Sequence, residues 1–211
     1  MMNTFCHKYL EILASDYPNL NLTRILAPTD LYNKQVLDSI LPAKESKSFQ
    51  NAINSKIPII DIGFGGGFPI LPLAVEYPDV RFIGFEAREK KVLAVRDMAT
   101  KLNIKNVSLF HYRFEDVFFD RESFITFKAI GEIKDILMKI KTNRRLDIFF
   151  YKGPNVVEKE NPKNKIAEWE LAEKNEIKIP ETLGRITLCY KNVPRGTKSM
   201  NQKLVKLSNI L

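Results

Sequence analysis

The sequence predicts an α/β fold in which a mostly parallel sheet is covered by helices on both faces. Continuous apolar runs, typical of parallel strands buried on both faces, alternate with amphipathic stretches of helical length. The first apolar run, residues 57–62, leads into four glycines at positions 63, 65, 66 and 67. Near the end, two further runs flank a turn at residues 182–184, which favours an antiparallel hairpin.

Residues 1–55 are expected to form a helical extension and a linker. Apolar side chains recur at helical spacing over residues 3–16, which predicts a first helix. A second helix is expected to begin near Thr29, with Asp30 as its cap. Residues 42–55 are mostly polar, so we expect them to be a linker to the main domain.

Residues 56–194 carry the alternation and are expected to form the main domain. The apolar runs predict strands at residues 57–62, 80–85, 107–111, 124–127 and 146–151. The intervening stretches predict helices at residues 68–76, 88–102, 133–140 and 158–174. The closing hairpin is expected at residues 176–179 and 185–190, and residues 195–211 are expected to be a basic tail.

Composition excludes several classes of protein. With 211 residues, 45% of them hydrophobic and 27% charged, the chain has a globular composition, which excludes wholesale disorder. Cys6 and Cys189 stand far apart and form no CxxC motif, so we expect neither a disulfide framework nor a metal site. No signal peptide and no run of 18 apolar residues is present, so we expect a cytoplasmic protein without a membrane span.

The charge balance favours a polyanionic partner. Lysine and arginine number 33 against 25 acidic residues, a net charge of +8. No acidic residue follows Glu181, and this final stretch is typical of a phosphate-facing surface or, equally, of a solvated chain end. Its basic residues are Arg185, Lys191, Arg195, Lys198, Lys203 and Lys206.

The glycine-rich segment joins a predicted buried strand to a predicted helix and reads Asp61-Ile62-Gly63-Phe64-Gly65-Gly66-Gly67-Phe68-Pro69. Glycine permits positive φ there, and the missing Cβ lets a ligand lie against the backbone. A dinucleotide-binding loop, G-x-G-x-x-G, requires a third glycine where this chain has Phe68. The observed Asp-x-Gly-x-Gly-x-Gly pattern is that of a class I S-adenosylmethionine-dependent methyltransferase. The cofactor-binding candidates are therefore Asp61, Gly63, Gly65, Gly67 and Phe68.

A carboxylate follows at the spacing that this reading requires. Glu86 closes the second apolar run, 19 residues beyond Gly67. At the end of a second parallel strand, a carboxylate accepts hydrogen bonds from ribose hydroxyls, so Glu86 joins the cofactor-binding candidates. The alternative is an ordinary surface glutamate at the start of a helix.

Four segments make the chain resemble the bacterial small-subunit rRNA methyltransferase G family, also called GidB. They are Asn21-Leu22-Thr23, Lys34-Gln35-Val36-Leu37-Asp38-Ser39, the glycine loop through Pro72, and Glu86 with Lys90-Lys91-Val92. The resemblance covers about residues 9–152. Lys34, Gln35 and Lys128 stand where the family usually has arginine, histidine and arginine.

The resemblance implies a seven-stranded class I fold and methylation of guanine N7 in a loop of 16S rRNA, with S-adenosylmethionine as cofactor. It implies that Phe114 and Glu115 flank the adenine. Lys128 is expected near the methyl-transfer centre, as a cofactor-binding and catalytic residue. RNA contacts are expected from Lys34, Lys152, Arg195 and Lys198. Asp38 is expected either to hold a loop near the pocket or to lie on a helix surface.

Guanine N7 carries an in-plane lone pair, so the absence of an evident general base is consistent with this reaction. The expected partner is 16S rRNA or the small ribosomal subunit, and a monomer suffices. Three other readings stay open: a methyltransferase of another RNA, a small molecule or a protein; a non-catalytic RNA-binding module with the same fold; and a nicotinamide-dependent oxidoreductase, against which Phe68 counts.

Overall fold

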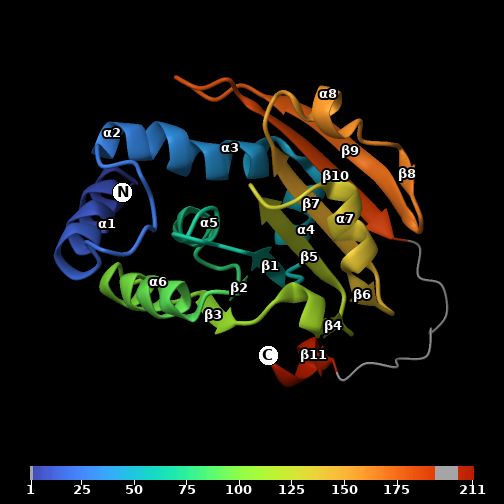
Figure 1. Cartoon of the computed structure of the whole chain (residues 1–211), viewed down its shortest axis with the longest axis horizontal. Helices are drawn as coiled ribbons and strands as arrows, with labels where there is room; N and C mark the ends of the chain where they lie inside the picture. The colour runs from blue at the N-terminus through green and yellow to red at the C-terminus, as the bar shows by residue number, and fades with distance from the viewer. Residues whose placement is uncertain (1, 193–203) are drawn as a thin grey trace.

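The computed structural model describes residues 2–192 and 204–211 and has one eight-stranded sheet at its centre (Figure 1). The strand order is β3-β2-β1-β5-β7-β10-β9-β8. The first five strands of this order run parallel, and β10, β9 and β8 each pair antiparallel to the preceding strand. The bounds are β1 (Ile59–Ile62), β2 (Phe82–Glu86), β3 (Val107–His111), β5 (Ser123–Lys128), β7 (Leu146–Lys152), β8 (Lys165–Ile166), β9 (Trp169–Ile177) and β10 (Arg185–Asn192).

This arrangement confirms the predicted fold class, with one strand more than the seven expected. Every residue of β1, β2 and β5 is buried, because helices cover both faces of the sheet. One core lies under the N-terminal helices and includes an aromatic cluster of Phe49, Phe124 and Phe149. The second core, on the opposite face, includes Phe127 and Trp169.

The predicted linker at residues 42–55 is wrong, because two helices cover residues 42–54 except Ser46. The N-terminal region contains α1 (Met2–Asp16), α2 (Pro28–Leu31), a π-helical segment (Tyr32–Leu37), α3 (Asp38–Glu45) and α4 (Lys47–Asn54). Asp30 is not a cap: α2 begins after Ala27. The Ser46 side chain caps α4 instead, by accepting from the Phe49 amide at 3.1 Å. Helix α4 buries Phe49 and Ala52, together with the polar Ser48.

The predicted charged helix at residues 158–174 is also wrong. Helix α8 (Val156–Glu160) is short, and the chain then enters β8 and β9. The inward positions of β9 include Glu173, whose carboxylate accepts from the Lys47 and Ser48 amides at 2.9 and 2.8 Å. A strand with a charged residue on its inner face lacks the apolar alternation by which strands are predicted.

The other helices follow the parallel strands as predicted: α5 (Ile70–Glu76), α6 (Glu89–Lys101) and α7 (Ile133–Lys139). No helix among residues 2–192 and 204–211 is long and apolar enough to cross a bilayer.

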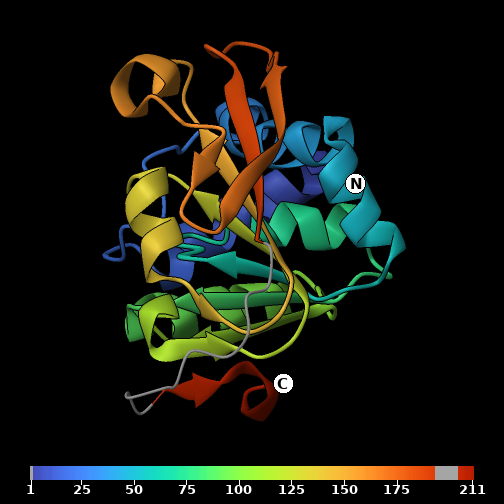
Figure 2. The same ribbon diagram turned by 90° about the vertical axis from the view of Figure 1, so that its right-hand side faces the viewer.

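A second sheet of three strands, which was not predicted from the sequence, pairs the C-terminal segment with the main domain. Its strand order is β11 (Val205–Lys206), β4 (Val117–Phe119) and β6 (Lys141–Thr142), and Figure 2 shows β11 at the foot of the molecule. The Ser208 amide and hydroxyl donate to the two carboxylate oxygens of Asp120 at 2.9 and 2.6 Å. Of the expected basic tail, Arg195 and Lys198 lie outside the described residues.

Candidate functional site

The glycine loop lies between β1 and α5, at the carboxyl end of the sheet. Gly63, Gly65 and Gly67 have φ angles of +68°, +54° and +93°. Residues that carry a side chain rarely adopt positive φ angles, which explains why glycine occupies these alternate positions. The Gly63 amide donates to the Phe85 carbonyl oxygen at 2.6 Å, which ties the loop to β2.

The loop is packed closely at Gly66 and Gly67 and open at Gly65. A Cβ on Gly66 would collide with the Leu22 carbonyl, and one on Gly67 would lie 2.6 Å from the Leu71 Cδ1 atom. A Cβ on Gly65 would meet nothing nearer than the Gly63 carbonyl oxygen, at 3.8 Å. Gly65 therefore presents bare backbone beside free space, as a ligand cradle requires.

The N-terminal extension holds this loop from behind. The Tyr9 hydroxyl of α1 donates to the Gly66 carbonyl oxygen at 2.7 Å, and its ring packs edge-on against Phe68 with centroids 5.1 Å apart. Tyr9 is fully buried, and burial raises the pKa of its hydroxyl well above the usual value. Sequence patterning identified Tyr9 only as an apolar helix position, because the contact spans 57 residues.

Glu86 joins the glycine loop to the next turn. Its side chain is 8% exposed, and its two carboxylate oxygens accept from the Gly65 amide at 3.1 Å and the Arg88 amide at 3.0 Å. The carboxylate thus lies directly beside the open position of the loop. Each oxygen keeps a free lone pair, so the group remains able to accept hydrogen bonds from a ligand.

Asp61 is a buried carboxyl with one unused oxygen. Its Oδ1 atom accepts from the Thr126 hydroxyl at 2.7 Å, whereas Oδ2 has no partner among the described residues. Burial raises the pKa of Asp61 to about 7, against the lowering effects of the Thr126 hydrogen bond and of Lys128. A buried polar atom without a partner is costly, and Oδ2 of Asp61 is one of four such side-chain atoms among the described residues.

Lys128 lies at the end of β5, in a buried charged cluster. Its ammonium lies 2.8 Å from the Asp38 carboxylate of α3 and 3.2 Å from the Gln35 Oε1 atom, and Ser39 lies at 3.5 Å. Arg185 of β10 contacts the same carboxylate through Nε and, at 2.9 Å, through Nη2. Arg185, which was expected in an acid-free stretch that was either a phosphate-facing surface or a solvated chain end, is paired with Asp38.

Two cations keep Asp38 ionised. Burial by itself raises the pKa of this carboxyl, but Lys128 and Arg185 outweigh it and hold the pKa below its usual value. For Lys128, burial lowers the pKa and the facing Asp38 carboxylate opposes that effect. The cluster joins α3, β5 and β10 at the edge of the sheet that carries the glycine loop.

The two residues expected at the adenine lie after β3. Phe114 is buried and packs edge-on against Phe127 of β5, with ring centroids 5.4 Å apart. Glu115 is half-buried, with its carboxylate 3.7 Å from the Lys139 ammonium.

Two of the lysines that were expected to contact RNA are already paired with carboxylates. Lys152 is buried: its ammonium is 2.8 Å from the Glu160 carboxylate and donates to the Gly131 carbonyl oxygen at 2.7 Å. The same carboxylate accepts from the Ile133 amide at 2.8 Å, so Lys152 fixes the start of α7. Lys34 is exposed and is paired with Asp30 at 3.0 Å.

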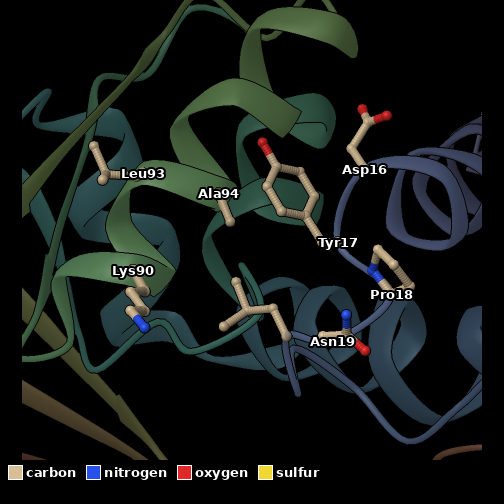
Figure 3. A pocket seen from close by; sticks show the side chains of 8 residues that line it. Asp16, Tyr17, Pro18, Asn19, Lys90, Leu93 and Ala94 are labelled. Atoms are coloured by element: carbon tan, nitrogen blue, oxygen red, sulfur yellow. The ribbon is translucent and has the colours of Figure 1, made fainter.

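A hollow of about 420 Å³ lies between the C-terminal end of α1 and α6 (Figure 3). None of the predicted site residues lines it, and the Tyr17 hydroxyl beside it donates to Asp97 at 2.7 Å. Its lining residues are Asp16, Tyr17, Pro18, Asn19, Leu20, Lys90, Leu93 and Ala94. The candidate site is therefore the glycine loop with Glu86, Asp61 and the charged cluster.

Comparison with known proteins finds a matching family. The family model for rRNA small subunit methyltransferase G matches residues 2–186. The protein of that name from Petrotoga mobilis is 34% identical over an aligned length of 184 residues, and the match covers 81% of this chain and 76% of that protein. The one from Leuconostoc citreum is 36% identical over 110 residues, and this match spans 52% of this chain and 45% of the relative.

A solved structure shares the fold. The crystal structure of MtNAS in complex with MTA and tNA aligns with a TM-score of 0.53 and 16% identity, and the alignment covers 92% of this chain and 71% of that one. The family match spans the N-terminal helices, the glycine loop and the sheet as far as β10. The chain belongs to the rRNA small subunit methyltransferase G family.

Proposed function

We propose that this chain is an S-adenosylmethionine-dependent methyltransferase that methylates N7 of a guanine in 16S rRNA of the small ribosomal subunit. The observation that carries the proposal is the pairing of an open Gly65 backbone with the Glu86 carboxylate 3.1 Å from the Gly65 amide. Membership of the family supports the rRNA substrate.

The residues present fit this cofactor. Gly65 offers bare backbone, Glu86 offers acceptors for ribose hydroxyls, and the unused Oδ2 of Asp61 offers an acceptor for a cationic group. Phe68, Phe114 and Glu115 complete the proposed set, with Gly63 and Gly67 shaping the loop. S-adenosylmethionine supplies an electrophilic methyl group on a sulfonium, which the N7 lone pair of guanine attacks without prior loss of a proton.

Because this reaction requires no general base, the residues of the chain act by binding and orientation. Lys128 was expected to make a catalytic contact. Its ammonium is already engaged by Asp38 and Gln35, so we propose a different role for it. We propose that Lys128 is a positioning residue, which fixes α3 over the cofactor site. Because the proposed substrate is the small ribosomal subunit, we also propose that the protein is cytoplasmic, and that it acts as a monomer.

The proposal is tested by incubating the protein with undermethylated small ribosomal subunits and S-adenosylmethionine, followed by chemical cleavage at 7-methylguanosine. We expect cleavage at one guanine of 16S rRNA. Failure under conditions in which a relative from the same family succeeds contradicts the proposed activity.

Gly65→Val is expected to abolish cofactor binding, because the new side chain occupies the open space beside the loop and strains a backbone with φ of +54°. Isothermal titration calorimetry with S-adenosylmethionine measures the effect. Gly153→Val is the matched control, since a Cβ at Gly153 meets nothing within 4 Å. Retained affinity in Gly65→Val, or an equal loss in both variants, contradicts the placement of the ligand.

Tyr9→Phe is expected to weaken S-adenosylmethionine binding about tenfold, because the Gly66 carbonyl loses its buried partner at a cost of about 1–3 kcal/mol. Tyr17→Phe is the control: it removes a hydroxyl that donates to Asp97 at 2.7 Å, away from the loop. Calorimetry should show reduced affinity for Tyr9→Phe alone. Equal affinities in the two variants would show that the hydroxyl does not position the loop.

Asp61→Asn is expected to change the pH dependence of stability. The folded pKa of about 7 lies above the unfolded value, so the native carboxyl retains its proton while the unfolded one ionises. The free energy of unfolding of the wild type should therefore carry a contribution that decreases as pH rises from about 4 to about 7. Urea unfolding across this range should show no such contribution in Asp61→Asn, and parallel pH curves for the two proteins would refute the assignment.

A further inference from the structure

Exposed basic residues precede all five parallel strands of the main sheet. Within the three residues before each of β1, β2, β3, β5 and β7 there are six basic residues and three acidic ones, Asp79, Asp120 and Glu122. The basic residues are Lys56, Arg81, Lys105, Arg121, Arg144 and Arg145, and all six are exposed. We call these six residues the amino-edge belt.

The topology of the sheet brings the amino-edge belt together. The amino ends of parallel strands share one edge, and the strand order β3-β2-β1-β5-β7 places Lys105, Arg81, Lys56, Arg121 and the Arg144–Arg145 pair in that sequence along it. Neighbouring strands lie about 4.8 Å apart, so five strands carry these cations across about 20 Å. The result is a row of positive charge rather than scattered surface residues.

The three acidic residues in the same segments offset only part of this row, because six basic and three acidic residues leave a net charge of +3. Among the described residues, Lys56, Arg81, Lys105 and Arg121 form no ion pair. The Asp120 carboxylate accepts from the Ser208 amide and hydroxyl and keeps its negative charge, and the Arg145 guanidinium lies 4.0 Å from the Asp147 carboxylate. Within three residues after the same strands there are two basic residues, Arg88 and Arg113, and one acidic residue, Glu89. The excess of positive charge at strand ends therefore lies at the edge opposite the glycine loop.

The carboxyl ends of α5 and α6 also lie at this edge, and cations at the carboxyl end of a helix interact favourably with the helix dipole. Lys101, in the last turn of α6, serves that role and is held by Asp16 and Asp97 at 2.6 and 2.7 Å. Dipole effects fall off within one turn, and β5 and β7 follow no helix that ends directly before them. The helix dipole therefore does not account for Arg121, Arg144 and Arg145, of which Arg144 donates through Nε to the Asp120 carbonyl oxygen at 3.3 Å and Arg145 faces Asp147.

We propose that the amino-edge belt is a second rRNA-contact surface, which binds phosphates of the substrate on the edge opposite the methyl-transfer site. This inference rests on the proposed function, because it takes rRNA to be the polyanion. The two edges are separated by the length of β7, seven residues or about 20 Å, which a folded rRNA segment spans. Phosphate contacts of this kind fix orientation and carry no sequence specificity.

The test compares two variants with the same change in net charge. The belt variant combines Lys56→Gln, Arg81→Gln, Lys105→Gln and Arg121→Gln. The control variant combines Lys8→Gln, Lys47→Gln, Lys163→Gln and Lys174→Gln, four exposed lysines spread over α1, α4, the loop after α8 and β9. All eight side chains are exposed, so both variants should unfold in urea at the wild-type midpoint.

Binding to undermethylated small ribosomal subunits is measured as a function of salt concentration. Each lost phosphate contact lowers the slope of log K against log salt by about 0.7–0.9, so the belt variant should lose about 3 from its slope and about 10- to 100-fold in affinity. The control variant should keep the wild-type slope. Equal slopes for the two variants overturn the belt.

Methylation by the wild type separates the two proposals. If the wild type methylates the subunits and both variants bind alike, the belt fails and the proposed function stands. If the belt variant alone loses slope while the wild type transfers no methyl group, the RNA-contact surface stands and the proposed activity fails. If the wild type does not bind the subunits, both proposals fail.

Discussion

The site depends on a buried hydrogen bond between two distant parts of the chain, the Tyr9 hydroxyl and the Gly66 carbonyl oxygen. Four glycines in five positions make a loop with a large conformational entropy, so its shape must be imposed by its surroundings. Tyr9 and Leu22 press on the loop from the N-terminal side, and Glu86 holds the Gly65 amide from β2. The N-terminal helices are thus part of the cofactor site, although none of them belongs to the sheet.

A second constraint lies on the same face of the sheet, where charge replaces apolar packing. Asp38 pairs with Lys128 and Arg185, and all three come from different elements. A buried ion pair contributes little net stability, but removal of one partner leaves an uncompensated charge and costs about 3–5 kcal/mol. We infer that the cluster fixes the register of α3 over the sheet. Gln35, where the family usually has histidine, fits this cluster because its Oε1 atom accepts from Lys128.

The sequence was sufficient to predict the fold class, the parallel strands and the glycine loop, because each of these depends on short-range patterns. It was insufficient where long-range contacts override the local pattern. Helix α4 was interpreted as a polar linker, because the sequence does not show that Phe49 packs against Phe124 and Phe149 in the core. Strand β9 was interpreted as a charged helix because the charged Glu173 breaks its apolar alternation. In the structure this inward carboxylate accepts from amides of α4, which no local pattern indicates.

The same reasoning explains what the sequence could and could not predict of the site. Asp61, Gly65 and Glu86 could be proposed from the sequence because each has a fixed position relative to a strand end: Asp61 lies within β1, Gly65 follows β1, and Glu86 is the last residue of β2. The pairing of Lys128 with Asp38 joins residues 90 apart, and that of Arg185 with Asp38 joins residues 147 apart, so no local pattern encodes them. Lys152 is the last residue of β7, a position that the sequence alone does not distinguish from an exposed strand end, yet it is buried and paired with Glu160 of α8.

The most direct test of this account is a crystal structure of the protein with S-adenosylhomocysteine bound. The account predicts that the ligand lies against the Gly65 backbone, with its ribose hydroxyls donating to Glu86. A ligand bound elsewhere, such as in the hollow between α1 and α6, or a glycine loop that stays closed to it, would contradict the account.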